Sequence, residues 1–143
     1  MKALPSQHRF ISIYRAKGNL HLYLHVPFCA RRCSYCDFAI AVRRVIPVGE
    51  FVDGIVAELE TRLAANEIEP LTTLYLGGGT PSKLGADGVL LLLERLRAIP
   101  GLAIAEGAEV TMEANPEDVS ADAASAWREA GVEVMMVDPG PRE

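Results

Sequence analysis

The chain has 143 residues, half of them hydrophobic, which is enough for one domain with a single buried core and argues against a disordered chain. Its net charge of −5 is unevenly spread, because residues 1–44 carry eight basic side chains and one acidic one while the rest is strongly acidic. Aromatic side chains do not alternate with these basic groups, so we predict a locally basic site rather than a nucleic-acid partner. No apolar run approaches the roughly 20 residues of a membrane span.

The predicted elements alternate between strands and helices along the chain. Residues 1–19 are predicted to be a leader with a short strand at 10–14, and a turn follows at Gly18 and Asn19. Residues 20–26 alternate between apolar and polar side chains, which predicts a half-buried strand. Further strands are predicted at 72–76, 109–114 and 132–137. Helices are predicted at 49–65, 87–98 and 120–130, the last with Ser120 as its N-cap and Gly131 as its stop.

This order predicts an α/β fold with parallel strands and right-handed crossovers. Three and a half βα units make a partial barrel or an open sheet, whereas a full barrel needs eight. In either arrangement the ligand site lies beyond the carboxyl ends of the strands. The cysteine loop, the glycine-rich turn at 77–80 and Asn115 each follow a predicted strand. We therefore expect them to meet at one edge of the sheet.

All three cysteines of the chain, Cys29, Cys33 and Cys36, lie within eight residues in a C-x3-C-x2-C spacing. An odd number at short spacing does not make a disulfide framework, and a reducing cytoplasm fits best. The spacing allows three thiolates to converge on an iron–sulfur cluster, with one iron left open for another ligand. Zinc held by the cysteines and His25, or three unliganded thiols, remain alternatives on spacing alone.

Two other features lie at the same predicted edge. The glycine run 77–79 permits close approach of a ligand and would free backbone N–H groups to bind it, although tight turns also use glycine for structural reasons. Glu113 is predicted to share a face with Tyr23 and Thr111, where a carboxylate can bind an amine or a ribose hydroxyl. The alternative is a solvated acid on an exposed face. Of the remaining candidates, Trp127 is predicted to be core, and His21 and His25 to face the surface or a barrel lumen.

Four motifs together carry a family resemblance. They are Y-L-H-V-P-F-C at 23–29, C-S-Y-C-D-F at 33–38, G-G-G-T-P-S at 77–82 and E-A-N-P-E at 113–117. With Tyr35 before the last cysteine, they resemble the radical S-adenosylmethionine (SAM) superfamily. Within it they resemble the coproporphyrinogen III oxidase-like branch, and most closely its HemW-type haem chaperones. The resemblance extends from about residue 20 to residue 131.

The resemblance implies cofactors and partners. The cysteines would hold a [4Fe–4S] cluster with SAM on its open iron, and reduction of SAM would generate a 5′-deoxyadenosyl radical. It also implies haem or a porphyrin as a further ligand, a haem-accepting protein and an electron donor for the cluster. It assigns no catalytic residue, and whether the chain is an enzyme stays open. The positions that match SAM contacts in this branch are Tyr23, Tyr35, Gly78, Gly79, Thr80 and Glu113.

Two departures from the family pattern qualify this expectation. The oxygen-independent oxidases resemble C-x3-C-x2-C-x-C, but here the last position is Phe38, so haem insertion is expected in preference to decarboxylation of coproporphyrinogen. The family continues after the third helix with a strand like N-R-x-S-x-G-x-Q-S, which is not found after Gly131. We therefore expect residues 20–143 to be the N-terminal part of a radical SAM core, ended by a frameshift or a truncated reading frame near residue 132, with the C-terminal domain absent. A zinc-stabilised binding module and an inactive fragment are the alternatives.

Overall fold

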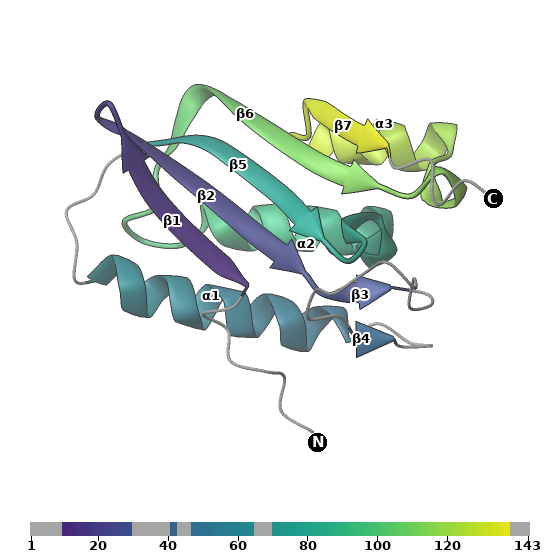
Figure 1. Ribbon diagram of the computed structural model, residues 1–143, viewed down its shortest axis with the longest axis horizontal. Coiled ribbons are helices and arrows are strands. Elements are labelled where there is room, and N and C mark those ends of the chain that lie inside the picture. The colour runs from purple at the N-terminus through teal and green to yellow at the C-terminus, as the bar shows by residue number, and fades with distance from the viewer. Residues whose placement is uncertain (1–9, 30–40, 43–46, 65–69, 138–143) are drawn as a thin grey trace.

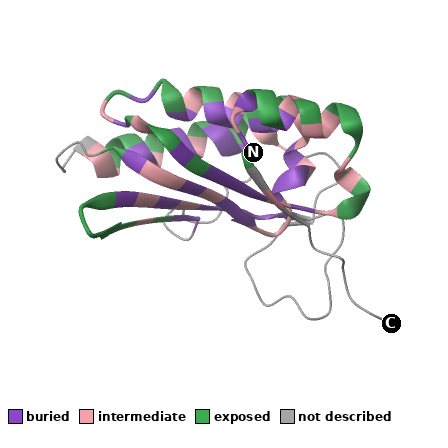
Figure 2. Ribbon diagram, turned by 90° about the horizontal axis from the view of Figure 1, so that it is seen from above, coloured by how far each residue is buried: buried purple, intermediate pink, exposed green. Residues whose placement is uncertain are grey.

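The computed structural model describes residues 10–29, 41–42, 47–64 and 70–137. These form a five-stranded sheet with three helices on one of its faces (Figures 1 and 2). The sheet order is β1 (Ile11–Ala16), β2 (Asn19–Val26), β5 (Leu71–Gly78), β6 (Ile104–Ala114) and β7 (Val134–Val137). The helices are α1 (Val48–Ala64), α2 (Gly85–Arg97) and α3 (Ala121–Ala130). The short elements are β3 (Phe28–Cys29), β4 (Ala41–Val42) and the 3-10 helices η2 (Pro81–Leu84) and η3 (Pro116–Asp118).

Strands β2, β5, β6 and β7 pair in parallel, which confirms the predicted α/β fold. Each connection between neighbouring parallel strands passes through one helix, as a parallel sheet requires. Strand β1 instead pairs antiparallel with β2. Lys17 and Gly18, with φ values of 55° and 81°, form the tight turn between them. Residues 11–16 of the predicted leader therefore form an edge strand of the sheet, which ends two residues later than the strand predicted at 10–14.

Two irregularities determine which side chains face the helices. In β5, Leu71 lies opposite Leu20 but Thr73 lies opposite His21, so Thr72 is an extra residue, and its Oγ1 donates to the Leu20 carbonyl at 3.0 Å. In β6, Ile104 lies opposite Leu71 but Glu109 lies opposite Thr73, so the stretch between them is irregular. Beyond these bulges both strands alternate regularly. The predicted strand at 109–114 is thus only the regular part of β6.

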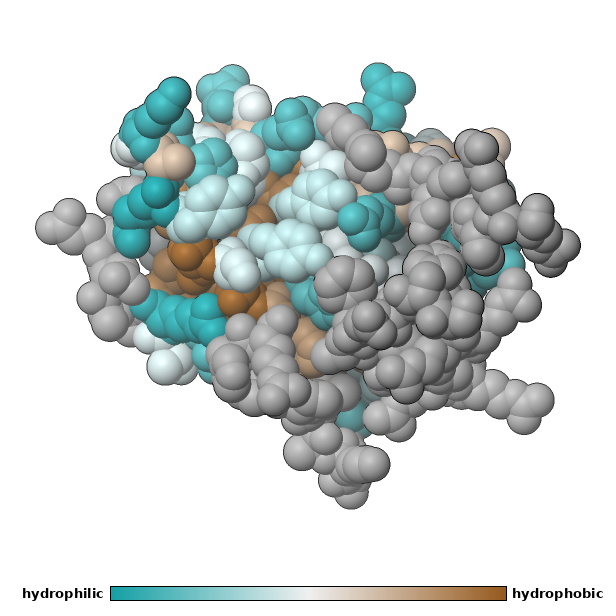
Figure 3. Space-filling model, in the orientation of Figure 1, coloured by the Kyte–Doolittle hydropathy of each residue, from teal (hydrophilic) through white to brown (hydrophobic). Residues whose placement is uncertain are grey.

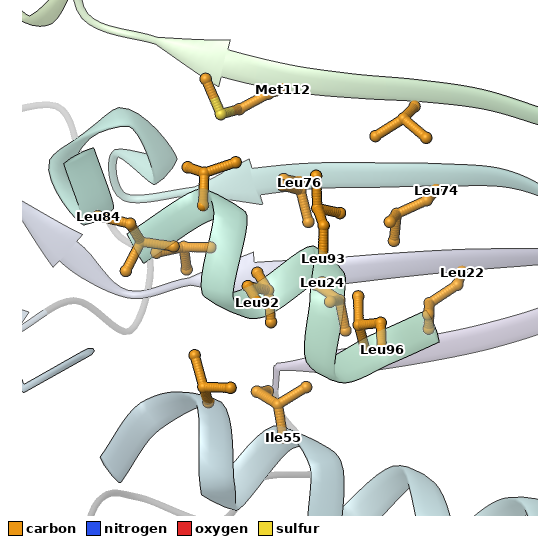
Figure 4. Packing of buried hydrophobic residues seen from close by; sticks show 14 of the residues in the cluster. Leu22, Leu24, Ile55, Leu74, Leu76, Leu84, Leu92, Leu93, Leu96 and Met112 are labelled. Carbon is orange, nitrogen blue, oxygen red and sulfur yellow. The ribbon is translucent and has the colours of Figure 1, made fainter. Parts of the chain in front are cut away.

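The core lies between the sheet and the helices. Figure 4 shows leucines of α2 between the strands and Ile55 of α1. Leu92, Leu93 and Leu96 are fully buried there. Trp127 of α3 is 1% exposed, as predicted for a core residue, and its Nε1 donates to the Gly85 carbonyl at 3.2 Å. Among the described residues, no helix is long and apolar enough to cross a lipid bilayer.

Both predicted ends of α3 are confirmed. The Ser120 side chain accepts a hydrogen bond from the Ala123 N–H at 3.0 Å, which satisfies one free donor of the first turn. Gly131 ends the helix in the left-handed conformation, with φ of 114°. A Cβ at this position would also collide with the guanidinium of Arg97, which donates to the Ala130 carbonyl at 2.7 Å.

Two leucines of α2 provide a matched test of the core. Leu92 is fully buried, whereas Leu90, two positions earlier, is 39% exposed. We expect Leu92→Ala to lower the free energy of unfolding by about 2–5 kcal/mol, because the change leaves a cavity. Leu90→Ala should cost well under half of that. Urea unfolding followed by circular dichroism measures both values, and equal losses would contradict the observed orientation of α2.

A candidate ligand site at the carboxyl edge of the sheet

Three parallel strands end side by side and bring their following turns together. They are β2, β5 and β6, which are neighbours in the sheet (Figure 1). The Gly79 N–H donates to the Val26 carbonyl at 2.9 Å, so the glycine turn is tied to the end of β2. One residue further along, Pro27 leads into β3, which ends at Cys29. The predicted meeting of these segments at one edge is therefore observed for the described residues.

Glu113 is held by two donors from the neighbouring strand. The Tyr75 hydroxyl donates to Oε2 at 2.7 Å and the Gly78 N–H donates to Oε1 at 3.2 Å. The side chain is half-buried, and each carboxylate oxygen has a second lone pair beyond the bond it accepts. The carboxylate is therefore fixed in orientation while it keeps acceptor capacity for a ligand. This excludes the alternative of a freely solvated acid.

The two tyrosines beside Glu113 act as neutral hydrogen-bond donors. Tyr23 and Tyr75 stack with ring centroids 5.7 Å apart. Burial and the charge of Glu113 raise the pKa of Tyr23. Burial, the hydrogen bond to Glu113 and its charge, and finally Tyr23, raise the pKa of Tyr75 to about 12. Both phenols thus keep their protons at neutral pH.

Side chains of the protein itself occupy the space that a Cβ would need at two glycines of the turn. A Cβ at Gly78, where φ is 109°, would run into the His25 ring. A Cβ at Gly77 would lie 2.8 Å from Cε1 of Tyr75 and 2.9 Å from the Tyr23 hydroxyl. The N–H groups of Gly78 and Gly79 already bind Glu113 and Val26. The expectation that these N–H groups are free for a ligand is therefore wrong, since a side chain of β6 and a carbonyl of β2, the two neighbouring strands, accept from them.

The chemistry of this edge fits a cationic group better than an anionic one. Among the described residues of this edge, the N–H groups of Gly78 and Gly79 are already bonded, whereas the Glu113 carboxylate keeps acceptor capacity, and a protonated amine carries only donors. A phosphate would instead require several free N–H groups, as at anion-binding turns. The observed set of donors and acceptors therefore fits a ligand with an ammonium group.

A cavity of about 700 Å³ opens on the same face of the sheet, nearer the amino ends of the strands. His21 lies at this cavity, as predicted for a side chain facing a lumen or the surface. Its Nδ1 is 2.7 Å from the Thr73 hydroxyl, and its ring stacks on Tyr14 at 4.9 Å. Figure 3 shows pale aromatic rings around an apolar floor on this face. The cavity is lined by Ser12, Tyr14, His21, Leu22, Tyr23, Thr73, Leu74, Tyr75, Glu109 and Thr111.

Comparison with known protein families assigns the chain to one of them. Residues 23–139 match the model of the Radical SAM superfamily. The chain belongs to the radical SAM superfamily. The match includes the second half of β2, all of β5 and β6, and the whole segment with the cysteines between β2 and α1.

Curated relatives of this radical SAM chain are haem chaperones. It is 39% identical over 119 residues to heme chaperone HemW of Escherichia coli (strain K12), which covers 82% of this chain and 31% of the relative. It is 42% identical over 98 residues to heme chaperone HemW of Lactococcus lactis, which covers 68% of this chain and 24% of the relative. The chain therefore spans about a third or less of the length of these relatives.

A solved structure supports the fold. Coproporphyrinogen III oxidase (HemN) from Escherichia coli, a radical SAM enzyme, matches with a TM-score of 0.63 over 80% of this chain and 26% of that one. The sequence identity of 24% is low, so this likeness concerns the fold alone. It confirms the partial radical SAM barrel expected from the sequence.

Those predicted site residues of the radical SAM chain that the structure describes lie together at the carboxyl edge of the sheet. Tyr23 and Glu113 face the same side, and Gly78 bonds directly to Glu113. Gly79 and Thr80 complete the same turn, with Thr80 as the extended residue before η2. Tyr35, Cys33 and Cys36 lie outside the described residues. The backbone of Cys29 is placed in β3, directly after the end of β2.

Sequence reasoning missed several residues of this edge. Tyr75 shares the open face with Tyr23 and lies two positions before the glycine run, which is the one local signal that could have indicated it. Ser82, Lys83 and Asp118 form hydrogen bonds between the turns after β5 and β6. Because Asp118 is more than 30 positions from its partners, no local pattern indicates these contacts.

The raised pKa of Tyr75 is testable by alkaline titration. Glu113→Gln should lower this pKa from about 12 but leave it above the ordinary value of 10.0, because burial, its largest cause, persists. The tyrosinate absorbance of the parent chain and of Tyr75→Phe identifies this phenol. Glu109→Gln is the matched control, since Glu109 lies on the same face of β6 and does not contact Tyr75.

The direction of the effect on stability follows from the same shift. Tyr75 has a higher pKa in the folded chain than in the unfolded chain, so its protonated phenol contributes stability that is fully present below about pH 10. That contribution is lost as the pH rises through about 12. Tyr75→Phe should therefore lose less stability than the parent chain between these values, and an identical alkaline loss would contradict the assignment.

Proposed function

We propose that this chain binds a [4Fe–4S] cluster through Cys29, Cys33 and Cys36, and SAM at the carboxyl edge described above. We further propose that it belongs to a cytoplasmic protein of haem metabolism that acts as a haem chaperone. The observation that carries the proposal is the oriented Glu113 carboxylate, held by Tyr75 and Gly78 beside the strand end that leads to Cys29. Membership of the radical SAM superfamily supports the cofactors.

The residues present fit the amino acid part of SAM. Its methionyl ammonium is a donor, and the edge offers the second lone pairs of the Glu113 carboxylate oxygens. A charged hydrogen bond of this kind is stronger than a neutral one. Tyr23 shares the open face with Glu113, whose charge, with burial, raises the pKa of this phenol, and its hydroxyl lies 3.4 Å from Nδ1 of His25. When bound, the cluster supplies an electron for reductive cleavage of SAM, while these residues orient the cofactor.

The haem chaperone role rests on the curated relatives. Both HemW proteins above are named heme chaperones and align over most of this chain. Phe38, where the oxidases have a further cysteine, favours the chaperone branch over decarboxylation of coproporphyrinogen. Haem, a haem-accepting protein and an electron donor are therefore the proposed partners.

Anaerobic reconstitution followed by SAM titration tests this function. The chain incubated with iron and sulfide should show the broad visible absorbance of a [4Fe–4S] cluster, bleached by dithionite, and then bind SAM in a calorimetric titration. Replacement of Cys33 by Ala should abolish the absorbance, because a cluster held by two thiolates is not retained. Stoichiometric zinc without this absorbance would reject the cluster and favour a zinc-stabilised binding module.

Glu113 should contribute strongly to SAM affinity. We expect Glu113→Gln to weaken binding of SAM to the reconstituted chain about 10-fold or more, because the amide removes the charge that the ammonium meets. Cluster content, measured as iron and sulfide per chain, should not change. Glu109→Gln is again the control and should bind as the parent does. Equal affinity of the Glu113 and Glu109 variants would contradict the proposed SAM contact.

A further inference from the structure

Ser82 connects the turns that follow β5 and β6. The residue is 2% exposed, and its hydroxyl makes two hydrogen bonds inside the protein. Its Oγ donates to Oδ2 of Asp118 at 2.7 Å and accepts from the Asn115 N–H at 3.0 Å. A buried hydroxyl with both roles filled is costly to disturb, because either partner would be left unpaired. Asn115 lies two residues after Glu113, so Ser82 fixes the backbone at the end of β6.

Lys83 adds an ionic contact between the same two turns. Its Nζ lies 2.8 Å from Oδ1 of Asp118 and 3.1 Å from Oε1 of Glu117. Asp118 therefore uses one oxygen for Ser82 and the other for Lys83. Burial lowers the pKa of Lys83, but the hydrogen bonds to Asp118 and Glu117 outweigh it and leave the pKa raised. The lysine remains charged, and the ion pair with Asp118 is largely shielded from solvent.

The contacts of Ser82 and Lys83 lie on one side of the glycine turn, and those of Glu113 lie on the other. On one side Tyr75 and Gly78 hold the Glu113 carboxylate. On the other side Ser82 bonds to the Asn115 N–H and Lys83 bonds to the Asp118 carboxylate, both after the end of β6. The glycine turn lies between the two sets of bonds. Its position relative to Glu113 is therefore determined by both.

We propose that Ser82, Lys83 and Asp118 form a brace that positions the Gly77–Gly79 turn and Glu113 for the ligand of the carboxyl edge. None of the three contacts Glu113 itself, so each acts through the backbone and side chains it holds. That this ligand is SAM rests on the proposed function. The brace itself rests on contacts within the protein and can be tested without any ligand.

Hydrogen exchange at the Gly78 amide reports directly on the brace. In Asp118→Asn and Ser82→Ala, exchange of this amide should be about tenfold faster, because the bond to Glu113 opens more often. Amides of α1 such as Ile55 should keep their protection. Asp53→Asn is the matched control, since Asp53 pairs with Arg95 at 2.7 Å on the exposed surface of α1 and α2. Lys83→Met should act like Asp118→Asn, and Lys83→Arg should restore slow exchange.

SAM titration of the reconstituted variants separates positioning from stability. Asp118→Asn should weaken SAM binding about tenfold at unchanged cluster content, whereas Asp53→Asn should not. Unchanged Gly78 exchange in the brace variants would overturn the proposal. Faster exchange with unchanged SAM affinity, in a parent chain that binds SAM, would overturn it as well. A parent chain that does not bind SAM would reject the proposed function, and the exchange result alone would then decide for or against the brace.

Discussion

The hydrogen bonds between Glu113 and strand β5 are the constraint on which the candidate site depends. They join the end of β6 to its neighbour and require the observed register of the two strands. The irregular stretch between Ile104 and Glu109 sets that register, and Gly107 within it has φ of 79°. A slip of one residue would turn Glu113 toward the leucines of α2 and bring Ala114 to the open face. A bulge remote from the site thus determines which face the carboxylate occupies.

The same hydrogen bonds determine what the edge can bind. The N–H groups of Gly78 and Gly79 bond to Glu113 and Val26, so these two donors are not available to an anion. Tyr23 and Tyr75 keep their protons and add no negative charge. Lys83 is close along the chain, but its charge is directed to Asp118 and Glu117. The Glu113 carboxylate therefore keeps acceptor capacity for a cationic ligand, which an anion-binding turn of the same glycine content would not offer.

The order of elements and the meeting of three strand ends were predictable because their signals are local. Alternation around Glu113 correctly placed it with Tyr23, and Ser120 and Gly131 marked the ends of α3. The membership of β1 in the sheet was less evident, because an edge strand with exposed Tyr14 shows weak alternation. The partners of Tyr75 and Asp118 were not predictable, since each lies more than 30 residues away, and only the place of Tyr75 before the glycine run is a local signal. The wrong expectation for the glycine N–H groups has the same cause, because their partners come from other strands.

Packing on the opposite face of the sheet supports the geometry of the carboxyl edge. Parallel neighbours must be connected through a helix, so the spacing of β2, β5 and β6 is coupled to how α1 and α2 pack. Leu92 and Leu96 fill the layer between α2 and the strands and leave little freedom for the sheet to shift. Trp127 connects α3 to the beginning of α2 through the Gly85 carbonyl, directly after the η2 turn that carries Ser82. The brace and the hydrophobic core therefore meet at η2, which carries Ser82 and directly precedes Gly85.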